Sequence, residues 1–480
     1  MVYRNIGIDL GVTAKHKAQI CDEKGIKVET FSFHITRENL DVLCSKALKG
    51  ASQGTKLRII CEPTSMSWFP IAVYAKKNGH EVVRVKSHKT YDLRKYFSRN
   101  KKNDKLDAKL LSLMPMIDEK AVEQIYLPKS KLFMLERFNR QRERLTKELA
   151  SIKNRLISLY HWAIPGLTNC FEDPFDNRAR SFYRHFSNSV KAKESGIKGI
   201  KEIIEPACRQ RMKEELPEKL YRIACNSCLL YEGSADWIDF ESIQAEVAIE
   251  LDHFDMLENY LSKIKERIKS MYDEVYPSKH LETIKGIGPT LGPSIIGIIC
   301  DPNRFSSQKK LRSFAGLIPQ QDDSGESNKK GLSLTQEGSA RFRRDLFIAA
   351  DVSRQWDPQL AKIYYTEMVH KGHCHYQAVC SVMTHLINRI LCVLKENRPY
   401  RLLDDNGNQV SSKEAKSIIK ERFVVPEEVR QRTRSRRSRK NRREEPIRNL
   451  LTRQLNAPQN SYPVPLETII QNFEKIENAS

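Results

Sequence analysis

The sequence has no uninterrupted apolar run of the length that a helix needs to cross a lipid bilayer. Its first residues, MVYRNIGIDLG, lack the charged and apolar regions of a secretory signal peptide and begin instead with a strand-like segment. The first absence argues against a membrane-spanning protein and the second against a secreted one. We therefore expect a cytoplasmic protein.

The sequence also lacks the paired cysteine motifs of zinc modules and disulfide scaffolds. Its 11 cysteines are scattered through apolar segments, and Cys225 and Cys228 form a lone CxxC step. A structural zinc ion takes about four ligands, and no second pair has suitable spacing. In a reducing compartment such cysteines are packed as free thiols, which is the interpretation we favour.

Acidic residues are in short supply, with 60 Asp and Glu against 82 Lys and Arg. The resulting net charge of +22 favours a polyanionic partner over a merely soluble basic protein, because Lys and Arg neutralise phosphates and release condensed counterions. A hydrophobic content of 40% is enough for folded cores. The length of 480 residues predicts two to four domains.

Residues 1–125 predict an α/β domain in which strands alternate with helices. The helices are expected at residues 37–48, at residues 67–79 with Gly79 at the C-terminal end, and from Asn103 onward. The last of these has an apolar face that contains Leu106 and Leu110. The strand-like segments are YRNIGIDLG, AKHKAQIC, KVETFSFHI, KLRIICEPT and EVVRVKS.

Residues 126–280 predict a helical middle region. One heptad-like seam comprises Phe254, Leu257, Leu261, Ile264, Ile268, Met271 and Val275. A second apolar pattern lies between residues 145 and 159. Together, the two patterns predict two helices that form an antiparallel pair within the chain, an intermolecular coiled coil, or both. An amphipathic helix packed on a globular core is the structural alternative. The insertion at 161–245 is expected to be globular and mostly helical.

The C-terminal part divides into a compact helical region, residues 281–400, and a basic tail, residues 401–480. The tail contains a dense arginine run that includes Arg434, Arg436 and Arg437. A block of like charge is disordered by itself and binds phosphate backbones without sequence preference. We expect these three arginines to contact nucleic acid, with RNA favoured.

Four carboxylates of the first domain form an ordered pattern. Asp9 and Glu62 come at the ends of apolar strands, where an unpaired charge is costly. Asp104 and Asp107 stand at positions i and i+3 of a helix and share one face. Hard oxygen ligands suit Mg²⁺, and two ions about 4 Å apart can clamp both oxygens of a phosphoryl transfer. In the alternative interpretation, Asp104 and Asp107 form ordinary ion pairs with neighbouring lysines, and Asp9 and Glu62 only cap the ends of their strands.

The order and placement of these four acids resemble the RuvC-like, ribonuclease H-type domain of the DEDD transposases of the insertion sequence 110 family. The segments IKGIGPTLGPSIIGIICDPNRF and RFRRDLFIAA resemble the C-terminal transposase domain of that family. The resemblance covers roughly residues 3–160 and 281–400, with a coiled coil between. It implies a DNA transposase or recombinase with catalytic, metal-binding Asp9, Glu62, Asp104 and Asp107 and with two Mg²⁺ ions.

The resemblance also implies a covalent step. In the family a serine of the C-terminal domain attacks DNA, and it lies in a Ser-Gly step soon after an Ala-Gly-Leu-x-Pro segment. Here that segment, residues 315–319, is followed by Ser324 and Gly325, so Ser324 is the expected nucleophile. Ser327 is a near rival, and in isolation the loop would be an ordinary polar one. On the next helix, Arg341, Arg343 and Arg344 are expected to hold the scissile phosphate, unless they form a solvated face.

The family implies two further partners, a bridge RNA that pairs with donor and target DNA, and other copies of the chain in a dimer or tetramer. The sequence departs from the family pattern at Leu10–Gly11, where a Ser-Lys step is usual, and at Gln336–Glu337, where a basic residue is usual. Two alternatives stay open. One is a metal-dependent nuclease that uses only the acids and water, and the other is a non-catalytic nucleic-acid-binding protein.

Overall fold

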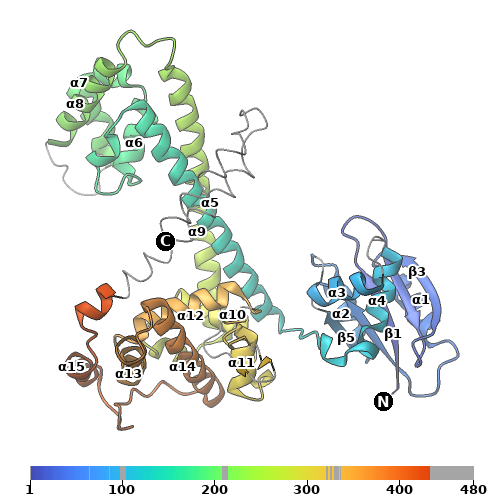
Figure 1. The fold of residues 1–480 in the computed structure, drawn as a ribbon. Coiled ribbons are helices and arrows are strands. Elements are labelled where there is room, and N and C mark those ends of the chain that lie inside the picture. Colours follow the sequence, from blue (N-terminus) through green and yellow to red (C-terminus); the bar gives the residue numbers. More distant parts are fainter. Residues whose placement is uncertain are drawn as a thin grey trace, which may run out of the picture. The chain divides into compact units, whose positions relative to one another are not determined.

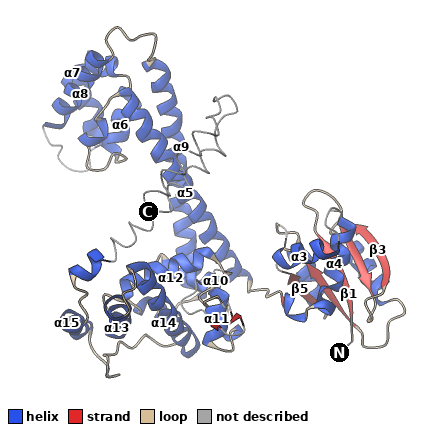
Figure 2. Ribbon diagram, viewed as in Figure 1, coloured by secondary structure: helices blue, strands red, loops and turns tan. Residues whose placement is uncertain are grey.

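A computed structural model describes residues 2–63, 65–85, 87–97, 104–207, 215–320, 323–324, 327–328, 334–335 and 337–432. The chain divides into two compact units, Met1–Lys129 and Ser130–Ser480. The first unit is α/β and contains the strands of one large sheet, whereas the second is almost wholly helical (Figures 1 and 2). This agrees with the expected combination of an α/β region and an α region.

The first unit is built on a six-stranded sheet in the order β3-β2-β1-β4-β5-β6. The strands β1, β2 and β3 form an antiparallel meander, β4 and β5 continue from β1 in parallel, and β6 runs antiparallel to β5. The strand bounds are β1 Tyr3–Asp9, β2 His16–Cys21, β3 Lys27–Phe33, β4 Lys56–Cys61, β5 Glu81–Val85 and β6 Val122–Gln124. The first five confirm the predicted strands, and β6 is an edge strand that the sequence pattern did not reveal.

Helices cover both faces of this sheet. The helices α1 (Arg37–Leu48) and α2 (Trp68–Lys77) share a core with side chains such as Ile59 of β4. On the other face, α4 (Asp104–Ile117) packs on residues such as Ile60 and Val83. The alternation along β4 follows from the two-residue period of a strand, which sends successive side chains to opposite faces. A further helix, α3 (Ser87–Phe97), precedes α4 and was not predicted.

Two long helices, α5 (Ser130–Ala163) and α9 (Phe240–Val275), pack along each other in the second unit (Figure 1). Ion pairs join Lys131 to Glu274 and Arg155 to Glu250, which shows that the helices run antiparallel. The predicted seam is buried from Phe254 to Met271. The antiparallel pair within the chain is therefore confirmed, and an intermolecular coiled coil stays a prediction.

The insertion between these helices is helical. It contains α6 (Asn177–Phe186), α7 (Ser189–Ile204) and α8 (Glu215–Leu230). Its centre is aromatic, with the rings of Tyr160 and Tyr183 stacked at a centroid distance of 3.6 Å. Both side chains are fully buried, so the insertion contributes to the continuous core of the unit.

The remaining helices are α10 (Leu291–Ile299), α11 (Gln308–Ala315), α12 (Ala340–Ser353), α13 (Pro358–Tyr365), α14 (His375–Glu396) and α15 (Ser412–Arg422). The helices α11, α12 and α13 pack on α14, whereas α10 packs on α5 and α12, and α15 packs on α13. In the described part of the chain, α14 is the one helix long and apolar enough to cross a membrane. Its buried residues, among them Val379, Leu386 and Ile390, belong to the core of the unit. The central position of α14 therefore accounts for its apolar composition.

The expected basic tail begins later than residue 401. Residues 401–432 are described, and they contain α15 with the capping box of Ser411 and Glu414 at its start. Val425 is buried in the core of the unit. Burial of apolar side chains explains why this stretch folds despite its many charges. The arginine run with Arg434, Arg436 and Arg437 lies outside the described residues.

Candidate active site

The first two acids of the predicted site lie side by side at one edge of the sheet. Strands β1 and β4 are parallel, and their register pairs Ile8 with Cys61. Asp9 and Glu62 are the next residues on the two strands. The carboxyl ends of neighbouring parallel strands share an edge of a sheet, and this is where α/β proteins place their sites.

Helix α4 lies directly on β1 because Gly7 has no side chain. A Cβ atom at Gly7 would lie 2.2 Å from the carbonyl oxygen of Ala108 and 2.3 Å from the amide nitrogen of Ser112. Both neighbours are backbone atoms of α4, which a rotamer change cannot move away. Gly7 therefore sets the distance between the helix that carries Asp104 and Asp107 and the strand that ends at Asp9.

Two cations hold the acids of α4. Asp104 accepts a hydrogen bond from Nζ of Lys17 at 2.7 Å, and Lys17 is paired with Asp9 in the antiparallel register of β1 and β2. Asp107 accepts one from Nε of Arg94 on α3, also at 2.7 Å. The side chain of Asp107 is nearly buried, whereas that of Asp104 is exposed. The lysine that bonds to Asp104 thus comes from β2, 87 residues away in the sequence.

The four acids interact electrostatically at Asp9. The pKa of Asp9 is raised to about 6, mainly by burial and then by the charges of Asp107, Asp104 and Glu62, in that order of size. Arg94 opposes the shift. Like charges disfavour ionisation because each added negative charge repels those already present. The fold thus gathers the four predicted carboxylates into one neighbourhood, as their order in the sequence suggested.

The described residues do not contain a group of three or more His, Cys, Asp or Glu side chains that are arranged to hold a metal ion. Instead, Lys17 and Arg94 supply the positive charge beside Asp104 and Asp107. The donor chemistry nevertheless suits a hard divalent cation, because all four side chains offer oxygen and their repulsion is relieved by bound positive charge. The residues therefore fit such an ion in chemistry, although their present geometry is that of ion pairs.

The second predicted site lies on a hairpin of the helical unit. The amide nitrogen of Thr335 donates to the carbonyl oxygen of Ile318 at 2.8 Å, and Pro319 pairs with Leu334. Farther out, the short strands β7 (Asp323–Ser324) and β8 (Ser327–Asn328) pair antiparallel. Ser324 is directly opposite Ser327 in this register. The backbone pairing therefore does not distinguish the expected nucleophile from its rival.

Two glycines fix the start of this hairpin against α12. Gly316 ends α11 with a φ of +69°, a conformation that favours glycine. A Cβ atom at Gly338 would lie 2.2 Å from the carbonyl oxygen of Phe314, so the two backbone segments touch. Arg343 ties them together, since its Nη1 donates to the carbonyl oxygen of Gly338 at 2.8 Å and to that of Ala315 at 3.4 Å.

The three predicted phosphate-binding arginines differ in their surroundings. Arg341 is 9% exposed, pairs with Glu136 of α5 at 2.7 Å, and has its pKa lowered mainly by burial. Arg344 is 43% exposed and pairs with Glu143 and Asp345. Arg343 is engaged with backbone carbonyls. Binding of a phosphate by any of the three stays a prediction, and Arg344 is the most accessible of them.

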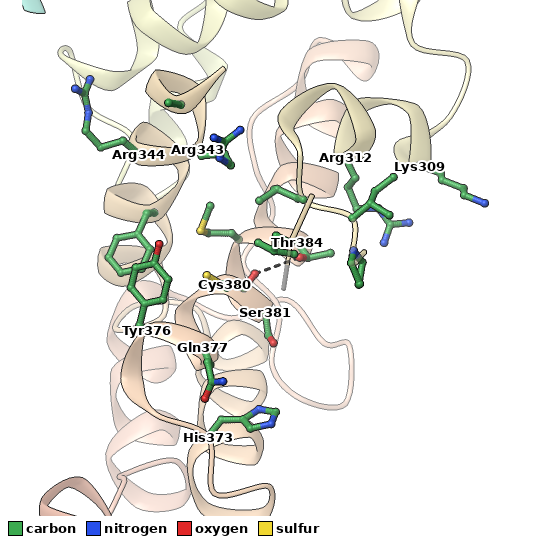
Figure 3. Close-up of a pocket in the computed structure, with 17 residues that line it drawn as sticks. Lys309, Arg312, Arg343, Arg344, His373, Tyr376, Gln377, Cys380, Ser381 and Thr384 are labelled. Atoms are coloured by element: carbon green, nitrogen blue, oxygen red, sulfur yellow. Dashed lines mark hydrogen bonds between the residues drawn. The ribbon is translucent and has the colours of Figure 1, made fainter. Parts of the chain in front are cut away.

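A cavity of about 1050 Å³ adjoins the base of the hairpin. Pro319 and Leu334 form part of its wall, and α11, α12 and α14 supply the rest (Figure 3). Four cationic side chains line it, Lys309, Arg312, Arg343 and Arg344, together with the aromatic rings of Phe347 and Tyr376. Sequence reasoning missed all of these except Arg343 and Arg344. In the sequence, the basic residues between Lys309 and Arg312 are the one local indication of this cavity.

Comparison with known proteins supplies the class. Residues 6–164 match the family profile of the IS110 DEDD transposases, and residues 278–365 match a second profile, that of the transposases of the IS116/IS110/IS902 family. Both profiles describe transposases, and together they cover the α/β unit, α5 and the helices around the hairpin. The chain belongs to the IS110 family of transposases.

Curated relatives agree with this family. The chain is 20% identical to the insertion element IS110 uncharacterized 43.6 kDa protein of Streptomyces coelicolor over 82% of this chain and 95% of that protein. It is 34% and 35% identical to the pilin gene-inverting proteins of Moraxella lacunata and Moraxella bovis. These two alignments cover 26% and 25% of this chain, and only 39% and 37% of those relatives' lengths.

Proposed function

We propose that this protein is a transposase that catalyses DNA strand exchange of an insertion sequence, through a serine–DNA covalent intermediate and a magnesium-dependent acidic site. The observation that carries the proposal is the environment of Asp9. Three further predicted acids, from a second strand and from α4, raise the pKa of that carboxyl. Such perturbed carboxylates cluster at functional sites. The names of the pilin gene-inverting relatives support DNA recombination as the reaction class.

The architecture of the first unit supports a RuvC-like, ribonuclease H-type domain. Its sheet has an antiparallel meander, β3-β2-β1, extended by the parallel strands β4 and β5. The acids stand at the ends of β1 and β4 and on the helix α4 that packs across β1. This placement of the acids supports the proposed RuvC-like domain.

Asp9, Glu62, Asp104 and Asp107 would hold the magnesium ions. When bound there, Mg²⁺ would neutralise charge that develops on phosphate oxygens during transfer. Lys17 and Arg94 would then have to give up their present bonds to Asp104 and Asp107. The raised pKa of Asp9 reflects the crowding of these acids without a cation, and a bound Mg²⁺ would lower it and keep Asp9 ionised as a ligand.

Ser324 would attack a phosphodiester of the DNA. A bond forms between its Oγ and phosphorus, the bond from phosphorus to the leaving deoxyribose oxygen breaks, and the hydroxyl proton passes to a base. Serine is a weak nucleophile without such a base or a metal ion, so the step requires help from acidic groups. The intermediate keeps the phosphoester bond as a link between serine and DNA. The hydroxyl group of a second DNA end can later attack this phosphorus, release the serine and complete the exchange.

A plasmid recombination assay tests the proposal. Asp104→Ala and Ser324→Ala should each abolish strand exchange, whereas Glu38→Ala, which changes an exposed acid on α1, should leave it unchanged. If Ser324→Ala kept full exchange and Ser327→Ala lost it, the nucleophile would be Ser327. Cleavage to free ends without a protein–DNA adduct would instead indicate a nuclease that uses water.

We also propose a bridge RNA as guide and a dimer or tetramer as the assembly. The net charge of +22 and the arginine run around Arg434, Arg436 and Arg437 support an RNA partner, because cationic side chains bind phosphate backbones. Sequencing of the RNA that co-purifies with the protein would test this. A discrete RNA whose loops match the donor and target junctions is the expected result, and random cellular RNA would count against it.

A further inference from the structure

The cavity beside the hairpin presents an aromatic face. The rings of Phe347 on α12 and Tyr376 on α14 stack at a centroid distance of 5.1 Å with an interplanar angle of 29°. Tyr376 is 57% exposed, and it lies on the cavity wall (Figure 3). Phe347 therefore supports one face of Tyr376, while more than half of the tyrosine side chain stays accessible. Such a surface suits a planar aromatic group, which gains by stacking.

The opposite wall carries positive charge. Lys309 and Arg312 come from α11, and in Figure 3 they lie across the cavity from Tyr376. Within the described residues, Nε of Arg312 is buried and has no hydrogen-bond partner. That nitrogen is closed to a ligand, so a phosphate would meet the terminal guanidinium nitrogens of Arg312 and the ammonium group of Lys309. Among the described residues that line the cavity there is no acidic side chain, which favours an anionic ligand over a cationic one.

The floor of the cavity offers hydrogen bonds. On α14, the side-chain oxygen of Gln377 accepts from the amide nitrogen of Cys374 at 3.1 Å, which leaves the side-chain amide nitrogen to donate. Thr384 donates its hydroxyl proton to the carbonyl oxygen of Cys380 at 3.1 Å, which leaves its oxygen to accept. Donors and acceptors of this kind match the edge of a nucleobase. The cavity volume of about 1050 Å³ is at the upper end of the range for small-ligand sites.

We propose that this cavity receives one unstacked nucleotide of the DNA strand that the hairpin serine attacks. The base stacks on Tyr376, its edge meets Gln377 and Thr384, and its phosphate lies at Lys309 and Arg312. The position supports this assignment, because Pro319 and Leu334 form both the cavity wall and the base of the hairpin that carries Ser324. The inference rests on the proposed function, since it names the form of the DNA that the same site takes.

Photocrosslinking tests the proposal on the full chain. The probe is a single-stranded thymidine oligonucleotide of about 12 nucleotides that carries one 5-iododeoxyuridine, with the modified peptide identified by mass spectrometry. We expect the crosslink in the α14 peptide that contains Tyr376. Tyr376→Ala should lower its yield about ten-fold, whereas Tyr376→Phe should retain it, because the stacking face is kept. Trp237→Ala, which removes an aromatic side chain that is 82% exposed, is the matched control and should have no effect.

Competition separates stacking from charge. An unlabelled thymidine strand should displace the probe from the cavity about ten-fold better than an abasic strand of the same length. Both strands carry the same phosphates, so the difference measures the contribution of the stacked base. Equal competition, or crosslinks only outside α12 and α14, would overturn the proposal. Stronger crosslinking of Tyr376 to a matched RNA strand would overturn the assignment to DNA.

The outcome for the cavity is distinguishable from that for the proposed function. If wild-type protein forms no covalent adduct with its junction DNA, the proposed function fails. If it forms the adduct and Tyr376→Ala forms it equally well with the same crosslink pattern, only the cavity assignment fails.

Discussion

The two units place opposite charges at their candidate sites. At the edge of the sheet, four carboxylates crowd together until the pKa of Asp9 rises to about 6. At the base of the hairpin, the described lining of a cavity has four cationic side chains and no acidic one. The first environment suits a cation, and the second suits a phosphate-bearing strand. In the proposed function, the acids of the first unit would hold the metal ions, and the cavity of the second unit would bind the strand that Ser324 attacks.

The largest predicted effect tests that division. Asp107→Asn should lower strand exchange by on the order of 10³-fold at any DNA concentration, because it removes a group needed for the chemical step. Lys309→Ala should lower exchange by about ten-fold at low DNA concentration only, because lost binding is recovered by mass action. A titration of DNA in the recombination assay distinguishes the two. A defect in Asp107→Asn that high DNA concentration cured would contradict a chemical role.

Within the helical unit, two neighbouring arginines should respond differently to truncation. Arg341→Ala should destabilise the unit by about 2 kcal/mol, because it removes the buried cation beside Glu136 and leaves that acid only the exposed Arg140 as an ion-pair partner. Arg344→Ala should cost less than about 1 kcal/mol, since its ion pair is partly exposed. Hydrogen exchange of the α5 and α12 peptides measures both. If both variants lost the same unfolding free energy, burial would not determine the strength of the ion pair between Arg341 and Glu136.

The acidic site should depend on the close approach of α4 to β1. Gly7→Ala should destabilise the first unit by about 2 kcal/mol, because the added methyl group meets backbone atoms that cannot rotate away. Gly288→Ala is the control, as a Cβ atom there meets nothing within 4 Å and its backbone needs no positive φ. Thermal unfolding of both variants gives the comparison. A tolerated Gly7→Ala would show that α4 is free to shift.

The smallest effect concerns pH. Because the pKa of Asp9 rises from 3.8 to about 6 on folding, the folded state holds this proton more tightly than the unfolded chain does. That contribution to stability is complete below about pH 4 and is lost as the pH rises through about 6. Without divalent cations, Asp9→Asn should therefore be more stable than wild type by about 1 kcal/mol at pH 7.5, after allowance for solvent screening. The difference should vanish near pH 4.

Hydrogen exchange of the β1 and β4 peptides at the two pH values measures this effect. Saturating Mg²⁺ should stabilise wild type more than Asp9→Asn, since the variant has lost one of the acidic oxygens that would bind it. If Asp9→Asn were less stable than wild type at both pH values, the carboxylates would not repel one another as the account requires.

The sequence was most informative where the signal is local. The helix predicted around residues 37–48 is confirmed, and its start is local, because the side chain of Thr36 caps it and an apolar face follows. Asp9 and Glu62 were grouped because each follows an apolar strand, and the structure adds that these two strands are parallel neighbours. The helix α3 was missed because residues 87–97 are mostly polar, and β6 because three residues carry no readable alternation.

Features made by distant segments could not be predicted. Arg341 and Arg344 look equivalent in the sequence, and only their partners Glu136 and Glu143, some 200 residues away, separate a buried arginine from an accessible one. The same holds for Lys17 at Asp104 and for the cavity formed by α11, α12 and α14. Pairings of this kind depend on how helices pack, which spacing along the chain does not encode.

Trapping of the protein–DNA adduct tests the central claim most directly. Wild-type protein, junction DNA, its co-purified RNA and Mg²⁺ would be quenched with denaturant, and the DNA-bound peptide would be identified by mass spectrometry. The account predicts a phosphoserine-linked peptide that contains Ser324, formed by wild type and absent from Asp104→Ala and from Ser324→Ala. Efficient exchange with no adduct on any serine of the hairpin would contradict it.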